Sequence, residues 1–218
     1  MTLDNKSFTM VCDDNVSYMR DVYNYLDSKT IEILSFFGLS DLKKKRRIII
    51  YNDLELYKKH IEVYHEYKDY MCADTNDGNI NILSLEAAHQ TKEHANMSID
   101  QLKSTILHEF VHICQQDVEL EHLDHDVVWF WEALATNLGN PERFTKIEIK
   151  ATNEEIEDFI SLRNNYSVSY TIRLYMLENY SREEIIEYVK FPSRLLRDCN
   201  NILNNAREWS IIKLNKDK

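Results

Sequence analysis

The sequence predicts an α+β fold in which three short strands lie among amphipathic helices. Apolar residues recur at helical spacing over most of the 218 residues, whereas three short segments between residues 47 and 85 are apolar or alternate between apolar and polar. The chain has only three glycines and two prolines, so it has few sharp breaks and no flexible linker. We therefore expect one domain, residues 1–218, with two lobes over residues 1–116 and 117–218.

Composition argues against several classes of partner. The net charge of -11 disfavours nucleic acid or anionic lipid as the main partner. No apolar run approaches the roughly 18 residues of a membrane span, and no basic and then apolar leader follows Met1. The four cysteines are widely spaced, which predicts buried free thiols in a reducing compartment. We therefore expect a cytoplasmic protein that binds neither nucleic acid nor membrane.

The first half of the chain predicts a long helix and then the three strands. Apolar residues recur every three or four positions over residues 14–37, and Gly38 follows as a stop. The basic run 43–47 is interpreted as a solvated turn before a buried strand rather than as a nucleic-acid site. The further elements expected here are a strand over 47–51, a helix over 53–67, a strand over 70–73, a turn over 74–79 and a half-buried strand over 79–85.

The second half predicts helices only. Ser98 or Asp100 caps a helix over residues 100–116, and Ser181 opens a later helix with a capping box. The other expected elements are helices over 127–138, 153–164, 166–180 and 193–209, and a short alternating segment over 143–150. Four further histidines have two interpretations each. His89 and His94 belong to a solvated loop or to a rim over a cleft, and His122 and His125 are solvated or form a second metal pair; the first interpretation is favoured for both.

The strongest functional signal is His108-Glu109-Phe110-Val111-His112. A helix brings positions i and i+4 onto one face about 5–6 Å apart, so two imidazoles can reach one Zn²⁺ at about 2.0–2.1 Å. Apolar residues fill one half of the wheel of residues 100–116, and both histidines lie near the middle of the polar half. The segment predicts two metal ligands, with Glu109 able to reach a metal-bound water. The alternative is a solvated helix that carries two histidines by accident.

A catalytic zinc site needs a third protein ligand and an open position for water. Glu132 is the candidate, because it lies at the edge of the apolar stripe of helix 127–138, beside the aromatic residues 129–131. A carboxylate that only meets solvent is seldom placed there. The alternative is that Glu132 pairs with a lysine or an arginine.

This arrangement resembles the gluzincin metallopeptidases. The glutamate follows His112 by twenty positions, which is thermolysin-like, and residues 129–135 are similar to the Trp-x-x-Glu-Gly-Leu-Ala pattern of small stand-alone gluzincin domains related to the aminopeptidase family. Ala133 replaces the usual glycine. Thr136 stands where thermolysin-like enzymes carry an aspartate that bonds a ligand histidine, so we expect Thr136 or Asn137 to take that role.

The resemblance implies a zincin-type fold, with a small mixed sheet and the active-site helix in the N-terminal lobe and a mostly helical C-terminal lobe across a cleft. It implies one catalytic Zn²⁺ that activates water, Glu109 as general base, and a peptide or protein substrate. A tyrosine about one helix beyond the glutamate ligand would donate to the oxyanion, which places that role on Tyr166, with Tyr170 second. The strand over 79–85 would be the edge that pairs with an extended peptide.

Two other functions stay open. A narrow regulatory protease, of the type that cleaves phage repressors, also carries His-Glu-x-x-His in a small cytosolic chain, but the spacing and context of Glu132 favour the gluzincin reading. A zinc-stabilised binding or regulatory module would keep the fold without turnover. A latent peptidase is a related case, in which the tail 193–218, with Trp209, would fill the cleft.

Overall fold

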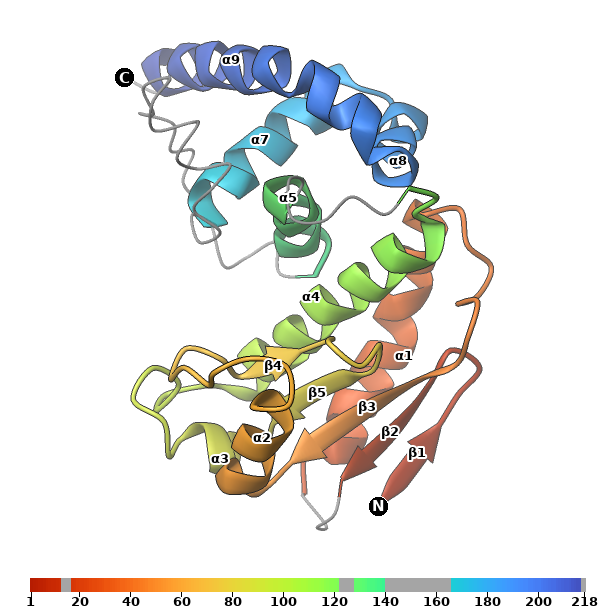
Figure 1. Ribbon diagram of the computed structural model, residues 1–218, viewed down its shortest axis with the longest axis vertical. Helices are drawn as coiled ribbons and strands as arrows, with labels where there is room; N and C mark the ends of the chain where they lie inside the picture. Colours follow the sequence, from red (N-terminus) through yellow and green to blue (C-terminus); the bar gives the residue numbers. More distant parts are fainter. Residues whose placement is uncertain (13–16, 122–127, 140–165, 217–218) are drawn as a thin grey trace. The chain divides into compact units, whose positions relative to one another are not determined.

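The computed structural model describes residues 1–12, 17–121, 128–139 and 166–216, and for 166–170 and 216 the backbone alone (Figure 1). The chain divides into two compact units, Met1–Asp117 and Val118–Lys218, and each is described by itself. The first unit contains a mixed sheet with helices, and the described part of the second unit is helical. The predicted α+β class is therefore confirmed.

The sheet of the first unit has five strands in the order β1-β2-β3-β5-β4. The strands are β1 (Thr2–Asp4), β2 (Phe8–Cys12), β3 (Arg46–Tyr51), β4 (Ala73–Asp74) and β5 (Ile80–Leu83). The three central strands β2, β3 and β5 run parallel, and the edge strands β1 and β4 are antiparallel to their neighbours. The antiparallel edges make the sheet mixed, as expected.

Strand β5 corrects two expectations. The segment 79–85 was expected to be a half-buried strand at the edge of the sheet, but all four residues of β5 are buried and β5 lies between β3 and β4. The turn over 74–79 folds the chain into a hairpin, so that β4 pairs with β5 and takes the edge position. Strand β4 starts at Ala73, where the predicted strand 70–73 ends. Strands β1 and β2 were not predicted.

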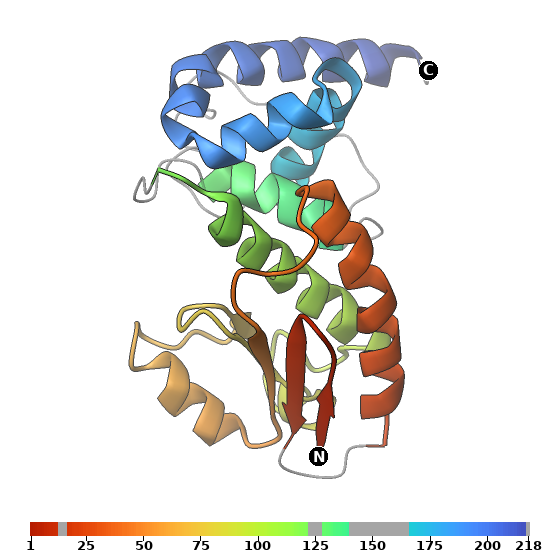
Figure 2. The same ribbon diagram turned by 90° about the vertical axis from the view of Figure 1, so that its right-hand side faces the viewer.

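Helices cover both faces of this sheet. In Figures 1 and 2, α1 (Met19–Phe36) and α4 (Ile99–Val118) lie on one face, and α2 (Leu54–Ile61) lies on the other. The core contains the isoleucines of the two adjacent central strands, in register as Ile48 with Ile80 and Ile50 with Ile82. Under α2, a second apolar cluster includes Tyr57 and joins the short helix α3 (Leu85–Ala88) to the sheet.

The ends of these helices follow local signals. Helix α1 ends where predicted, because Gly38 has φ of 70° and donates to the Ser35 carbonyl, while Leu39 donates to Leu34; together these bonds form a Schellman motif. Asp53 caps α2, accepting from the backbone N–H groups of residues 55 and 56. Helix α2 ends at Ile61 rather than 67, since residues 62–66 are exposed and have no apolar face to pack.

The second unit contains α5 (Val128–Gly139), α7 (Tyr166–Asn179), α8 (Arg182–Lys190) and α9 (Pro192–Lys216). Helix α7 packs against α5 and α9, and the predicted capping box of α8 is confirmed at Ser181 and Glu184. Helix α9 starts at Pro192, as proline at a first helical position favours, and continues past the predicted end at 209. His122, His125 and the predicted segments 143–150 and 153–164 lie outside the described residues.

Two further predictions concern the whole chain. All four cysteines are free thiols; Cys12 and Cys114 are buried, whereas Cys72 and Cys199 are half-buried and so only partly fit the expectation. Within the described ranges, every helix is too short or too polar to cross a membrane.

Candidate metal centre

Helix α4 carries the predicted histidine pair. Its first turn is closed by a capping box in which Ser98 Oγ accepts from the Gln101 N–H and the Gln101 side chain accepts from the Ser98 N–H. Its apolar side, including Ile106 and Phe110, is fully buried. The side with residues 108, 109 and 112 is half-buried. The amphipathic pattern of α4 is therefore confirmed, and the two histidines, expected near the middle of its polar half, are half-buried.

The two imidazoles face each other through the same ring atom. The Nε2 atoms of His108 and His112 lie 3.1 Å apart, and the ring planes cross at 82°. Two nitrogens bound at about 2.0–2.1 Å to one tetrahedral ion would lie about 3.3 Å apart. The pair is therefore already close to the spacing that a shared metal ion requires. Glu109 lies one position after His108 and is half-buried.

Gln115 is the residue of this centre that the sequence analysis missed. Its Oε1 lies 2.8 Å from His112 Nδ1, and its side chain is fully buried. On the helical wheel Gln115 is one of the polar residues, and nothing else in the sequence singles it out. The available signal was its spacing, because residues three apart on a helix are neighbours. The atom that contacts it is the one that points away from the His108–His112 pair.

The proposed third ligand belongs to α5 in the second unit. Glu132 is half-buried, whereas most residues of α5 are buried, including Trp129, Phe130 and Ala133. Glu132 offers a carboxylate oxygen, a donor of metal-ligand type, and its role as the third ligand stays a prediction.

Thr136 and Asn137, expected to bond a ligand histidine, are described, whereas the side chains of the two expected oxyanion tyrosines are not. Thr136 is buried, and Asn137 accepts a hydrogen bond from Arg173 of α7 and donates to the Ala133 carbonyl at 3.1 Å. Tyr166 and Tyr170 lie in the first turns of α7, and their side chains lie outside the described residues. Their catalytic role stays a prediction.

The other histidines of the first unit make local contacts. His89 Nε2 lies 2.8 Å from the Met97 carbonyl oxygen, and His94 Nε2 lies 3.0 Å from that of Tyr70. Both rings therefore tie the segment 86–98 to backbone nearby. This favours the loop interpretation over the rim.

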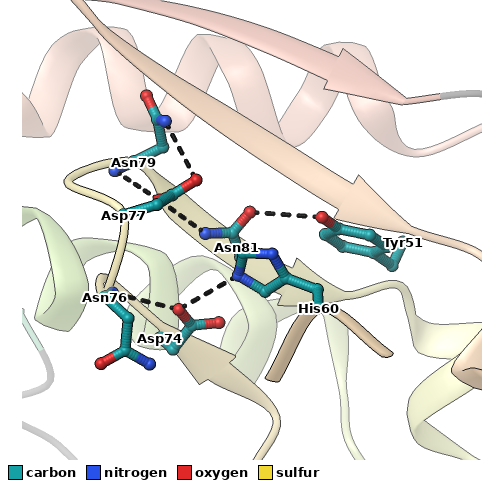
Figure 3. A network of polar contacts seen from close by, with 7 residues as sticks. All are labelled: Tyr51, His60, Asp74, Asn76, Asp77, Asn79 and Asn81. Carbon is teal, nitrogen blue, oxygen red and sulfur yellow. Dashed lines mark hydrogen bonds and ion pairs between the residues drawn. The ribbon is translucent and has the colours of Figure 1, made fainter. Parts of the chain in front are cut away.

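A second polar cluster lies on the α2 face of the sheet, around β4 and β5 (Figure 3). His60 Nε2 lies 3.4 Å from Asp74 Oδ1, which also accepts from the Asn76 N–H at 3.1 Å. Asp77 accepts from the buried Asn81 side chain at 3.0 Å, as well as from Asn79. The contacts of this cluster are hydrogen bonds within the hairpin and to α2, so we assign the cluster a structural role.

Burial and hydrogen bonding shift the pKa values of Asp74 and Asp77 in opposite directions. Burial raises the pKa of Asp74 above its usual value, against the opposing effects of Asn76 and His60. Burial also pushes the pKa of Asp77 upward, but the hydrogen bonds from Asn79 and Asn81 outweigh it, and the net shift is downward. The hairpin thus contains one carboxylate that resists ionisation and one that favours it.

Comparison with models of known protein families and with curated proteins finds no match to this chain. The resemblance to gluzincins rests on the residues described above.

Proposed function

We propose that this protein is a zinc-dependent metallopeptidase of the gluzincin type, with a zincin-type fold. The observation that carries the proposal is the His108–His112 pair, whose Nε2 atoms face each other 3.1 Å apart on a helix with a glutamate directly after the first histidine. Glu132, on the helix expected to supply the third ligand, would complete a His-His-Glu donor set. Two imidazoles and one carboxylate are a donor set of catalytic zinc in peptidases.

The donors fit a zinc ion in chemistry as well as number. His112 has its Nδ1 engaged by Gln115, so its Nε2 faces the proposed ion. Both histidines are half-buried, so neither ring is sealed in the apolar core. When bound, zinc would lower the pKa of a water molecule and polarise the scissile carbonyl.

The roles of the chain's own residues follow from their positions. His108, His112 and Glu132 would hold the metal. Glu109 would accept the proton of the attacking water and pass it to the leaving amine, because it directly follows His108 on the half-buried side of α4. Tyr166, with Tyr170 second, would donate a hydrogen bond to the developing oxyanion. The substrate would be a peptide or protein.

The sheet suggests where an extended substrate would bind. Strand β4 is the edge of the described sheet next to β5, so its outer side faces no other strand of that sheet. We therefore move the proposed pairing site from residues 79–85 to β4. The reason is that β5 is an inner strand, with β3 and β4 as its neighbours.

The test combines metal analysis with turnover. Purified protein should contain one equivalent of zinc and should cleave members of a peptide library. Glu109→Gln should keep the zinc and lose turnover by a factor on the order of 10² to 10⁴, the usual contribution of a general base. Glu93→Gln, an exposed glutamate of the same unit, is the matched control and should keep full activity.

Two results would contradict the proposal. Turnover that survives in Glu109→Gln would exclude Glu109 as the base, and wild-type protein that takes up no zinc would exclude the metal site. Full zinc occupancy with no cleavage of any peptide would favour the non-catalytic module instead. In a latent form, the tail with Trp209 would act as a plug. Here Trp209 contacts residues of its own unit: its Nε1 donates to Glu178 at 2.8 Å, and its ring contacts Tyr175.

A further inference from the structure

The contact between Gln115 and His112 determines more than the position of one ring. Gln115 Oε1 lies 2.8 Å from His112 Nδ1, and the two residues are three apart on α4. The Gln115 side chain has no exposed surface, so it has little freedom to turn away. Its neighbour Gln116 is exposed, although both are glutamines on the same helix. Burial of this one amide beside a proposed ligand is the observation that needs an explanation.

The chemistry of the two groups fixes the proton. A carboxamide oxygen can only accept a hydrogen bond, and a neutral imidazole has one N–H and one acceptor nitrogen. With Oε1 against Nδ1, the N–H of His112 must be on Nδ1. The lone pair is then on Nε2, the atom that faces His108.

We infer that Gln115 is a positioning residue of the metal centre. It holds His112 in the Nδ1–H tautomer, with its Nε2 lone pair directed at the metal position, and it fixes the plane of the ring. A ligand that is already in the right tautomer and orientation loses less conformational freedom on binding, so metal affinity rises. The inference rests on the proposed function only in that the metal binds at the histidine pair.

The first experiment measures zinc affinity by competition with a chromophoric chelator. Gln115→Leu removes the acceptor at nearly constant size and should weaken zinc binding by roughly 10- to 100-fold, the usual effect of losing such a partner. Gln115→Glu keeps an acceptor oxygen and should stay within a few-fold of wild type. Gln116→Leu is the matched control and should not change the affinity. A circular-dichroism melt of each metal-free variant checks that it folds.

The second experiment needs neither metal nor a variant. Long-range ¹H–¹⁵N correlation spectra of metal-free wild-type protein, at a pH where the rings are neutral, report which nitrogen of each histidine carries the proton. We expect Nδ1–H for His112. Because this measurement uses the wild-type chain, it decides the question even if Gln115→Leu does not fold.

The outcomes separate this inference from the proposed function. An Nε2–H tautomer for His112, or a folded Gln115→Leu variant that binds zinc as tightly as wild type, would overturn the role of Gln115 and leave the metallopeptidase proposal standing. Wild-type protein that binds no zinc would overturn the proposed function, whereas the tautomer result would still report the Gln115 contact.

Discussion

Arg46 and Asp117 form an ion pair in the interior of the first unit, with Arg46 Nη2 3.0 Å from Asp117 Oδ1. Only 18% of the arginine side chain and 3% of the aspartate side chain is exposed. The other carboxylate oxygen accepts from the Lys43 backbone N–H at 2.6 Å. The pair therefore joins the first residue of β3 to the last turn of α4, the helix that carries both histidines. The basic run 43–47 is thus a solvated turn only in part.

Removing the Asp117 carboxylate should lower the free energy of unfolding. Asp117→Ala leaves the Arg46 charge buried without its partner, which typically costs about 3–5 kcal/mol in free energy of unfolding. Glu55→Ala is the control, because Glu55 pairs with Lys58 at the surface and such pairs contribute about 0–1 kcal/mol. Urea unfolding of both variants measures the difference. Equal effects would show that the buried pair does not stabilise this unit.

Gly78 should not tolerate a side chain. Its φ of 74° is unfavourable for other residues, and a Cβ added there would lie 3.0 Å from Arg46 Nη1. Gly78→Ala should therefore lower the free energy of unfolding by about 1–2 kcal/mol from the backbone alone, with a further loss from displacing Arg46.

The control for this substitution is Gly38→Ala. Gly38 has a similar φ of 70° and measures the backbone contribution at the end of α1. Thermal melts should show the larger decrease for Gly78→Ala. A larger decrease for Gly38→Ala would mean that the Arg46 guanidinium moves aside at no cost.

The two carboxylates of Figure 3 should give opposite pH dependences of stability. The pKa of Asp74 is raised above 3.8, so between 3.8 and the folded pKa the folded chain holds a proton that the unfolded chain has lost. Asp74 ionisation therefore reduces stability as pH rises through that window. Asp74→Asn should remove this loss, so its stability relative to wild type should increase from about pH 3 to pH 7.

The pKa of Asp77 is lowered below 3.8, so its contribution is present above 3.8 and is lost as pH falls through the folded pKa. Asp77→Asn should reduce stability at neutral pH by about 1 kcal/mol or less, because Asp77 is exposed, and the deficit should shrink in acid. Urea unfolding at a series of pH values tests both variants. Parallel pH profiles for the two variants would contradict the assigned shifts.

Zinc should stabilise the folded protein, and a chelator should remove that gain. An ion that binds only the folded state contributes about 2.7 kcal/mol when its free concentration is 100 times Kd. His112→Ala and Glu132→Ala should each abolish most of the zinc-dependent rise in melting temperature. His94→Ala should keep it, because that ring contacts the Tyr70 carbonyl instead. A rise that persists in both ligand variants would place the ion elsewhere.

The sequence by itself determined the features that depend on local spacing. The face of α4 that carries His108 and His112, the stop at Gly38 and the capping box at Ser181 all follow from residues within about one helical turn of each other, so periodicity and capping residues predict them. The same local reasoning selected Glu132 as the candidate third ligand.

The tertiary structure alone decided which distant segments meet. The hairpin that makes β4 the edge and encloses β5, and the buried Arg46–Asp117 pair 71 residues apart, depend on pairing between segments whose local sequence is compatible with several arrangements. Gln115 shows the limit most sharply. Its spacing from His112 could be read in the sequence, but its burial depends on what packs around the helix, and that burial is what makes its hydrogen bond to His112 a fixed part of the centre.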